Sequence, residues 1–300
     1  MSKPNIHVAV AILLHRNKVL VGWRQAEQHQ GNKYEFPGGK VEQGETPLEA
    51  CRREVYEEVG VGISSWNDFD FIRHEYDDVI VNLHLFHAAV PDELLNEIQQ
   101  PWTWYSREEL TELNFPGANK SIVSRLVWKH KIRISEQLEV CQQLENDQLL
   151  YWRNDVTAES LKQLAELNIE QLPKLIVNME LWKKLNTVQQ QSISAVHLKQ
   201  QQLMALKKGE LKAGKRYIAA CHDLISMKHA QHIGCDAVLL SPVCRTATHP
   251  DAAPLGWSLF KEYATQVDIP VFALGGISHN DLIQVQQSGG YGIAGISTFN

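Results

Sequence analysis

Three glutamates at positions 54, 57 and 58 have the i, i+3, i+4 spacing that places side chains on one face of an α-helix. Three like charges on one face repel one another, so we expect a cation among them. A hard dication with oxygen ligands is the simplest choice, because Mg²⁺ commonly bridges carboxylates to substrate phosphates. Taken alone, however, most E-x-x-E-E runs are solvated acidic helix faces, and the surrounding residues must distinguish the two interpretations.

The residues around this run stand at fixed offsets from it. Residues 38–61 read G-G-K-V-E-Q-G-E-T-P-L-E-A-C-R-R-E-V-Y-E-E-V-G-V. From Gly39 onward they match every specified position of G-x5-E-x7-R-E-U-x-E-E-x-G-U, where U is a bulky aliphatic residue. This pattern is the signature of the Nudix hydrolases, which the chain resembles here at too many positions for a chance match.

The resemblance extends beyond the signature. The run R-Q-A-E-Q-H-Q-G-N-K-Y-E-F-P-G-G-K at 24–40 and the run F-P-G-A-N-K at 115–120 resemble the MutT-type 8-oxo-dGTP diphosphatases. Together these segments cover most of residues 5–130. The resemblance implies an enzyme that cleaves 8-oxo-dGTP, or a related nucleoside triphosphate, to the monophosphate and pyrophosphate. Such an activity cleans the nucleotide pool and so supports DNA repair.

The same resemblance assigns the metal and catalytic residues. One backbone carbonyl and three carboxylates hold the metal ion, those of Gly38, Glu54, Glu57 and Glu58. Arg53 orients these carboxylates by pairing with one of them, and either Glu54 or Glu57 is the general base. The implied reaction is attack of water at a phosphorus atom, with Mg²⁺ neutralising charge. Mn²⁺ is the alternative ion.

Five further residues are assigned to the nucleotide: Arg24, His29, Phe36, Lys40 and Asn119. Arg24 and Lys40 would contact phosphates, and His29 would help to close the site. Phe36 would stack on the base, and the amide of Asn119 can donate and accept at once, which suits a purine edge. Simpler alternatives are that Phe36 belongs to the core, that His29 is a surface histidine and that Asn119 caps a helix.

One position departs from the MutT-type pattern. In those enzymes a further glutamate, from the loop before a W-x-S strand, reaches the metal site. Here that position is Thr103, within P-W-T-W-Y-S, and Glu97 lies just upstream as a possible substitute. We therefore expect the general base among the signature glutamates rather than in this loop.

The elements that would position this site occupy residues 1–130, the expected first domain. Strands are predicted at 7–14, 19–23, within 34–40, and at 69–76, 79–90 and 102–105. A helix is expected to be capped by Thr46, to begin at Pro47 and to end at Gly60. A second helix is predicted at 121–130. This order indicates an α+β sandwich, as in the Nudix fold.

The pattern changes after residue 130. Residues 131–148 are polar and glutamine-rich, so we predict a linker or an entry helix. In residues 149–300, short apolar runs alternate with helical patterns, which indicates a parallel sheet or a (β/α) barrel. Seven strands are predicted, at 149–152, 175–177, 195–198, 217–220, 237–240, 271–274 and 293–296. Helices are expected at 158–167, 223–233 and 257–266.

Residues 149–300 resemble the thiamine-phosphate synthase family of (β/α)8 barrels. The matching pieces include A-V-H-L-K-Q at 195–200, A-A-C-H-D at 219–223 and V-F-A-L-G-G-I at 271–277. Glycines at 275, 276 and 295 follow late strands, where barrels commonly bind a phosphate on backbone N–H groups.

Several site residues of that family are altered. The motif H-x-G-Q-x-D, whose acidic residue helps to hold Mg²⁺, reads H-L-K-Q-Q-Q at 197–202, and the family's lysine after the sixth strand is His249. The second strand and its Q-x-R-x-K motif have no counterpart, because the interval from 152 to 176 is too short for two βα units. The chain also stops directly after the last predicted strand. We therefore expect an incomplete barrel without synthase activity, and expect Asp223 to cap a helix.

Composition restricts the partners. The formal net charge is −6, whereas a sequence-independent nucleic-acid binder needs a basic face, so we expect no nucleic-acid polymer. The five cysteines lack C-x-x-C spacing, which favours free thiols in a reducing compartment. The alternating apolar run near the N-terminus is too short to cross a bilayer. A cytoplasmic protein without a membrane partner is expected, and the oligomeric state stays open.

Three functions compete at this point. The leading hypothesis is a nucleotide-pool hydrolase acting on 8-oxo-dGTP. The second is a Nudix hydrolase of a thiamine-pathway diphosphate, suggested by the fused barrel. The third is a barrel that senses a phosphorylated ligand and regulates the Nudix domain.

Overall fold

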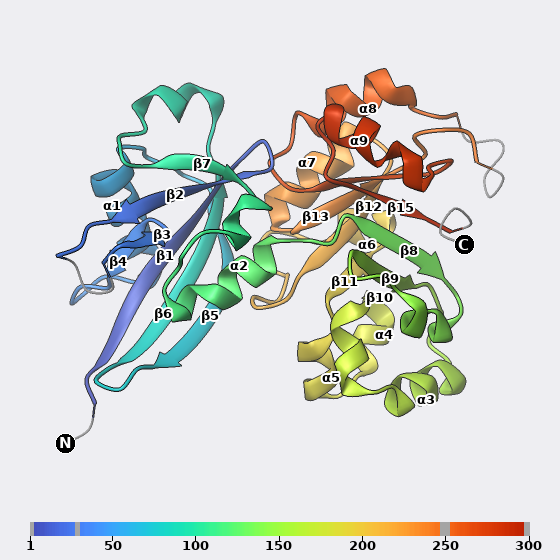
Figure 1. Cartoon of the computed structure of the whole chain (residues 1–300), viewed down its shortest axis with the longest axis horizontal. Helices are drawn as coiled ribbons and strands as arrows, with labels where there is room; N and C mark the ends of the chain where they lie inside the picture. Colours follow the sequence, from blue (N-terminus) through green and yellow to red (C-terminus); the bar gives the residue numbers. More distant parts are fainter. Residues whose placement is uncertain (1–2, 28–30, 247–252, 297–300) are drawn as a thin grey trace. The chain divides into compact units, whose positions relative to one another are not determined.

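The computed structural model describes residues 3–27, 31–246 and 253–296. The chain divides into two compact units, residues 1–128 with 212–214 and residues 129–211 with 215–300. The first contains an open sheet with few helices, and the second is a barrel with helices around it (Figure 1).

The first unit is built on a seven-stranded sheet. Five strands follow the order β3-β2-β1-β6-β5, while β4 pairs with β1 and β7 pairs with β2. Strands β1 and β6 run parallel, and the other pairs are antiparallel. The strands are β1 (Asn5–His15), β2 (Lys18–Arg24), β3 (Lys33–Glu35), β4 (Gly38–Lys40), β5 (Asn67–Glu75), β6 (Ile80–Ala89) and β7 (Thr103–Ser106). This arrangement confirms the predicted α+β class.

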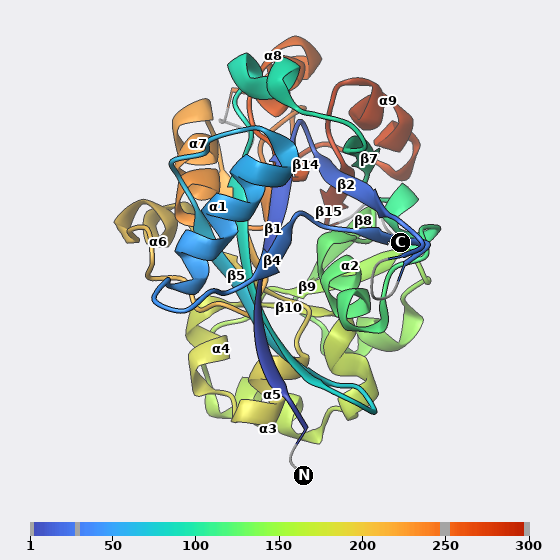
Figure 2. The same ribbon diagram turned by 90° about the vertical axis from the view of Figure 1, so that its left-hand side faces the viewer.

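Helix α1 (Pro47–Val59) has both of its predicted ends. The Thr46 hydroxyl accepts from the backbone N–H of Glu49, whose carboxylate accepts in return from the N–H of Thr46, so a capping box fixes the start. At the other end Gly60 adopts the left-handed conformation, with φ of 89°. One face of α1 is buried against β1 and β4 (Figure 2). That packing leaves the opposite face free to carry charge.

The helix predicted at 121–130 is shorter than expected. The second half of this unit contains η1 (Asp92–Glu97), η2 (Glu109–Thr111), η3 (Gly117–Asn119) and α2 (Lys120–Leu126). Helix α2 ends because Val127 adopts an extended backbone, with φ of −87° and ψ of 128°. From there the chain continues extended into a strand of the second unit, which a longer helix would prevent.

The second unit is a closed barrel of eight parallel strands, in the order β10-β11-β12-β13-β14-β15-β8-β9. The strands are β8 (Lys131–Ser135), β9 (Gln148–Trp152), β10 (Leu175–Asn178), β11 (Ala195–Leu198), β12 (Tyr217–Cys221), β13 (Ala237–Leu240), β14 (Val271–Leu274) and β15 (Gly292–Gly295). The prediction of an incomplete barrel was therefore wrong.

The error lies in residues 131–148, which are not a linker. They contain strand β8, which pairs with β15 on one side and β9 on the other, and the 3₁₀ helix η4 (Leu138–Gln143). Ile132 and Ile134 of β8 are buried, while its other three residues are partly exposed. The alternating strand pattern was present, but the polar composition around it obscured it. The predicted strand at 149–152 is consequently the second of the barrel.

Helices on the outside connect the barrel strands (Figure 1). They are α3 (Ala158–Glu166), η5 (Ile169–Lys174), α4 (Met179–Lys184), α5 (Thr187–Ser192), α6 (Gln200–Ala205), α7 (Leu224–Ile233), α8 (Gly256–Ala264), η6 (His279–Asp281) and α9 (Leu282–Gln287). Asp223 caps α7, as predicted, because its carboxylate accepts from the N–H of Ser226 at 2.7 Å. Among the described residues, none of the helices has the length and apolar character needed to cross a membrane. All five cysteines are free thiols.

Candidate active site on the Nudix helix and the mouth of the barrel

Arg53 is the centre of a network of carboxylates on the exposed side of α1. Its guanidinium donates to Glu45 at 2.8 and 3.2 Å, to Glu54 at 2.8 Å and to Glu57 at 3.2 Å. It also donates to the carbonyl of Lys40 at 3.1 Å. A planar guanidinium can serve several acceptors at once, which an ammonium group cannot do in the same geometry. Arg53 therefore holds three carboxylates of the signature in fixed positions relative to β4.

The two glycines of β4 allow this close approach. Gly38 has φ of 147°, and a Cβ there would lie 2.1 Å from the carbonyl oxygen of Ala9 on the neighbouring strand. At Gly39, a Cβ would lie 2.2 Å from a carboxylate oxygen of Glu54. The N–H of Gly38 donates to Glu58 at 3.0 Å. The absence of side chains on β4 thus brings its backbone against the glutamates of α1.

Glu58 carries the clearest electrostatic signature of the site. Burial raises the pKa of its carboxyl group to about 7, and the negative charges of Glu54 and Glu35 add to the increase. The hydrogen bond from the Gly38 N–H and the charge of Arg24 oppose this shift in pKa. Burial is thus the main cause, and at Glu58 the charges of Glu54 and Glu35 add to it against the opposing charge of Arg24. A cation bound beside Glu58 would favour its ionised form.

The predicted metal ligands have not gathered around one point. Glu54 and Glu57 turn toward Arg53, and Glu58 turns toward the N–H of Gly38. Within the described ranges, no three His, Cys, Asp or Glu side chains form a group ready to enclose an ion. The donors themselves are carboxylates and backbone carbonyls, which suit a hard dication. The side chain of Glu57 is 57% exposed and has room to turn.

Arg24 and Lys40, the predicted phosphate contacts, differ in their surroundings. Arg24 donates to Glu35 at 2.8 Å, and its Nε is buried without a hydrogen-bond partner. Burial raises the pKa of Glu35, while the charge of Arg24 opposes this increase. Lys40 is exposed at the end of β4, and its backbone carbonyl accepts the hydrogen bond from Arg53. Sequence reasoning missed Glu35, although its position opposite Gly22 in the β2–β3 pair places it beside Arg24.

Three other residues were predicted to contact the nucleobase or to close the site around the nucleotide. Phe36 is buried and stacks on Phe115, with ring centroids 5.0 Å apart and planes at 15°. Asn119 is half-buried at the start of α2, and its side chain makes no capping hydrogen bond there. Asn119 thus stands at the N-cap position of the simple alternative, but its side chain does not cap the helix. His29 lies outside the described residues.

The loop before β7 lies at the carboxyl end of α1. Trp102 donates from its indole to the carbonyl of Glu58 at 2.8 Å, and the N–H of Gln99 donates to Val59 at 3.1 Å. Thr103 is exposed at the start of β7, opposite Val21. No hydrogen bond or ion pair to another described residue is made by its side chain. The loop is thus anchored beside the glutamates without contributing a carboxylate from position 103.

A second candidate site lies in the barrel. A cavity of about 630 Å³ is lined by residues at the carboxyl ends of seven strands, β8 to β14. Active sites of (β/α)8 barrels are found at this end. Arg153, which follows β9, lines the cavity, so the second strand and a basic residue after it do exist. His249, expected at the position of the family's lysine, lies outside the described residues.

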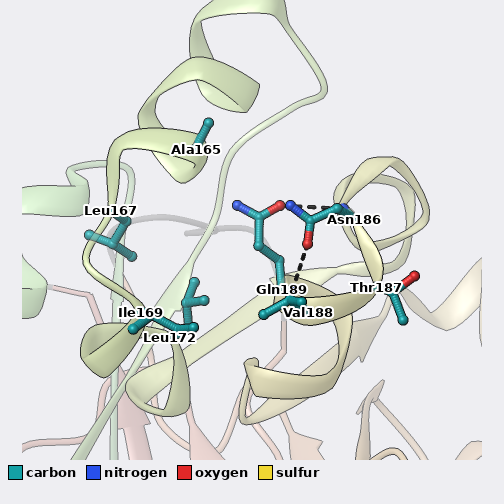
Figure 3. A pocket seen from close by; sticks show the side chains of 8 residues that line it. All are labelled: Ala165, Leu167, Ile169, Leu172, Asn186, Thr187, Val188 and Gln189. Carbon is teal, nitrogen blue, oxygen red and sulfur yellow. Dashed lines mark hydrogen bonds between the residues drawn. The ribbon is translucent and has the colours of Figure 1, made fainter.

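A shallower groove on the outside of the barrel carries less chemistry. It is formed by α3, η5 and α5 and is lined by Ala165, Leu167, Ile169, Leu172, Asn186, Thr187, Val188 and Gln189 (Figure 3). The amides of Asn186 and Gln189 bond to each other's backbone N–H, and Gln189 also donates to the carbonyl of Leu164. None of the lining residues is charged, and we assign the groove no role.

Comparisons with known proteins agree with this division. A family model described as "NUDIX domain" matches residues 8–125, and one described as "Thiamine monophosphate synthase" matches residues 137–299. The 8-oxo-dGTP diphosphatase of Escherichia coli is 34% identical over 123 residues, covering 40% of this chain and 95% of that protein. A solution structure of MutT from methicillin-resistant Staphylococcus aureus is 32% identical and covers 42% of this chain and 97% of that one, with a TM-score of 0.34.

The barrel has relatives of its own. A putative thiamine-phosphate synthase of Aquifex aeolicus is 45% identical over 80 residues, which are 27% of this chain. The aligned part spans only 43% of that relative's length. The match to the first unit, however, covers 95% of the length of the Escherichia coli 8-oxo-dGTP diphosphatase. The family model described as "Thiamine monophosphate synthase" matches more than half of this chain. The chain therefore belongs to the Nudix family through its first unit and to the thiamine monophosphate synthase family through its second.

Proposed function

We propose that the Nudix unit is a pyrophosphohydrolase that cleaves a nucleoside triphosphate to its monophosphate and pyrophosphate, with 8-oxo-dGTP as the preferred substrate. The observation that carries the proposal is the network of Arg53 with Glu45, Glu54 and Glu57, placed against the glycine strand β4. The relative named 8-oxo-dGTP diphosphatase supports the choice of substrate.

A divalent cation is part of the proposal, with Mg²⁺ preferred to Mn²⁺. Its donors would be the carboxylates of Glu54, Glu57 and Glu58 and the carbonyl of Gly38. Burial is the main cause of the raised pKa of Glu58, and the charges of Glu54 and Glu35, which add to it, support this assignment. When bound, the ion supplies charge neutralisation at the phosphates.

The side chains orient the metal ligands, accept the proton and bind the phosphates. Arg53 keeps the carboxylates oriented, and Glu54 or Glu57 accepts the proton of the attacking water. Arg24 and Lys40 bind phosphate oxygens, for which Arg24 is pre-positioned by its 2.8 Å pair with Glu35.

Base selection is assigned to the segment around α2. The amide of Asn119 has no capping role, so it is available to donate to and accept from a purine edge. Phe36 and Phe115 stack on each other and are both buried, so in this structure the pair belongs to the core of the unit. Asn119 also follows Phe115 by only four residues, within the same F-P-G-A-N run.

The test compares three forms of the full chain on 8-oxo-dGTP with Mg²⁺. The wild type should release pyrophosphate, and Glu57→Gln should lower kcat by a factor of about 10³ or more, as expected for loss of a metal ligand or general base. Glu93→Gln, an exposed glutamate in η1, is the matched control and should behave as the wild type. Full activity of Glu57→Gln, or release of inorganic phosphate alone, would exclude the proposed reaction.

A second candidate substrate is a thiamine-pathway diphosphate. The specific observation in its favour is that the second unit belongs to the thiamine monophosphate synthase family. Turnover of thiamine diphosphate or a pyrimidine diphosphate, at a kcat/KM above that for 8-oxo-dGTP, would support this candidate. Failure across that panel would remove it.

A further inference from the structure

Trp102 contacts both the helix and one of the strands that form the candidate active site of the Nudix unit. It is 7% exposed, lies directly before β7 and belongs to the same apolar cluster as Val59 at the end of α1. Its indole N–H bonds to α1, and its ring packs on β2. These two contacts are considered in turn, because they fix different parts of the site.

The indole N–H completes the carboxyl end of α1. The last four carbonyls of an α-helix have no partner within the helix. Trp102 donates to the carbonyl of Glu58 at 2.8 Å, and the N–H of Gln99 donates to the carbonyl of Val59 at 3.1 Å. The backbone N–H of Trp102 also donates to the carbonyl of Gln99 at 3.2 Å, which closes this short segment on itself. One segment therefore holds two carbonyls of the last turn of α1.

The indole ring lies against the backbone of Gly22 in β2. A Cβ built at Gly22 would lie 2.7 and 2.8 Å from two carbons of the ring, so a larger residue would displace it. Gly22 pairs directly with Glu35, and paired residues of antiparallel strands point to the same face. Arg24, two residues after Gly22, shares this face and donates to Glu35 at 2.8 Å. The ring thus stands on the face of the sheet that carries the arginine proposed to bind phosphate.

Glu58 is consequently held at both ends. Its carboxylate accepts from the N–H of Gly38 at 3.0 Å, and its carbonyl accepts from Trp102. Groups behind a metal ligand commonly set its orientation and so contribute to metal affinity. Because Trp102 bonds to the backbone, its effect extends to Glu57, the preceding residue of the same helical turn.

A buried tryptophan commonly places its indole N–H on a nearby carbonyl for stability alone. Trp66 is an example in the same apolar cluster, with the same exposed fraction as Trp102. It donates at 2.8 Å as well, but its acceptor is the carbonyl of Ile63, which lies after the end of α1. Comparison of Trp66 with Trp102 therefore separates the general effect of a buried indole from an effect on the ligands of α1.

We propose that Trp102 is a positioning residue of the hydrolase, which sets the place of Glu57 and Glu58 relative to Arg24 by joining the end of α1 to β2. This role rests on the proposed function, because a metal ion and phosphates are what these groups would bind. The loop before β7 then serves the metal site through an indole N–H at position 102 instead of a carboxylate at position 103.

The test measures binding of Mn²⁺ to the full chain by electron paramagnetic resonance, with Glu57→Gln identifying the ions bound at α1. Trp102→Phe keeps an aromatic ring in the core and removes the N–H. It should weaken Mn²⁺ binding about tenfold, as is common when a group behind a metal ligand is lost. Trp66→Phe is the matched control, which should lower Tm to a similar degree and leave the affinity for Mn²⁺ unchanged.

Pyrophosphate release from 8-oxo-dGTP is measured on the same proteins at several concentrations of Mg²⁺. Trp102→Phe should need about ten times more Mg²⁺ for half-maximal activity, and saturating Mg²⁺ should restore most of kcat. Trp66→Phe should have the Mg²⁺ requirement of the wild type. This split between metal requirement and kcat is not expected of a residue that only stabilises the fold.

Gly22→Ala tests the second contact while Trp102 is kept. Its Cβ should displace the ring and weaken Mn²⁺ binding in the same direction. In the double variant with Trp102→Phe, the loss of affinity should be smaller than the product of the two single losses, because both substitutions act on one contact. Independent losses, which multiply, would contradict the connection between β2 and α1.

Three results would overturn the role of Trp102. They are unchanged Mn²⁺ affinity in Trp102→Phe, an equal loss of affinity in Trp66→Phe, and the absence of Mn²⁺ binding at α1 in the wild type. If the wild type binds Mn²⁺ and Trp102→Phe shows the expected loss, but no pyrophosphate is released, the proposed reaction is refuted and the effect of Trp102 on the metal ligands is supported.

Discussion

Replacing Gly39 with alanine should slow catalysis by the Nudix unit without unfolding it. A Cβ at this position would lie 2.2 Å from one carboxylate oxygen of Glu54 and 2.6 Å from the other. Ordinary contact begins at 3.4 Å, so the carboxylate must retreat by about 1.2 Å. Displacements near 1 Å in a catalytic group commonly cost about a hundredfold in rate. We therefore expect kcat for 8-oxo-dGTP to fall about a hundredfold.

The folding cost should be small for a physical reason. The clash involves the end of a flexible side chain rather than backbone, so Glu54 can turn away, at the expense of its 2.8 Å pair with Arg53. We expect the free energy of unfolding to change by less than about 1 kcal/mol. Gly62→Ala is the matched control, because no atom lies within 4 Å of a Cβ built there.

The assay measures pyrophosphate release and thermal unfolding for the wild type and both alanine variants, at several concentrations of Mg²⁺. Gly39→Ala should need more Mg²⁺ for half-maximal activity, whereas Gly62→Ala should match the wild type. Wild-type kinetics in Gly39→Ala would show that the position of Glu54 against β4 is unimportant, and would refute the reasoning.

Three further predictions concern single side chains. Asn119→Ala should reduce the preference for 8-oxo-dGTP over dGTP about tenfold without lowering Tm, because the Asn119 side chain makes no capping hydrogen bond at the start of α2; an unchanged preference would contradict its role. Arg53→Lys should lower kcat at least a hundredfold, because one ammonium group cannot hold three carboxylates; near-normal kcat would disprove this. The pKa of His197 is about 3 when folded and 6.5 as a free side chain, so its contribution to barrel stability is lost as pH falls from 6.5 toward 3. Between pH 7.5 and 5, denaturant unfolding should show a loss of about 2 kcal/mol in the wild type that is absent in His197→Gln; equal losses would refute it.

Much of the first unit could be predicted because its signals are local. Helix α1 is bounded by Thr46 and Gly60, whose capping roles depend on residues within one turn. The signature also supplied the residue types around α1. It could not show that Arg53 joins three carboxylates, or that Arg24 pairs with Glu35, because these contacts depend on how β2, β3, β4 and α1 pack.

Strand β8 shows where local signals fail. Its five residues have a weak alternating pattern within a polar segment, and its neighbour β15 lies about 160 residues later in the chain. Pairing with β15 and β9 in the closed barrel stabilises β8, and the sequence pattern within β8 does not indicate this pairing. Missing this strand led to the mistaken linker and to the conclusion that the second strand had no counterpart. The altered residues at 197–202 were visible from the sequence, but the cavity and the unpaired nitrogen of His197 were not.

The most direct test of the central claim is the ratio of kcat/KM for 8-oxo-dGTP to that for dGTP, measured on the full chain with Mg²⁺ and with pyrophosphate as the detected product. A nucleotide-pool hydrolase with base selection through Asn119 predicts a ratio well above one, on the order of 10² or more, as for sites that read a base edge by paired hydrogen bonds. A ratio near one would contradict the sanitising role.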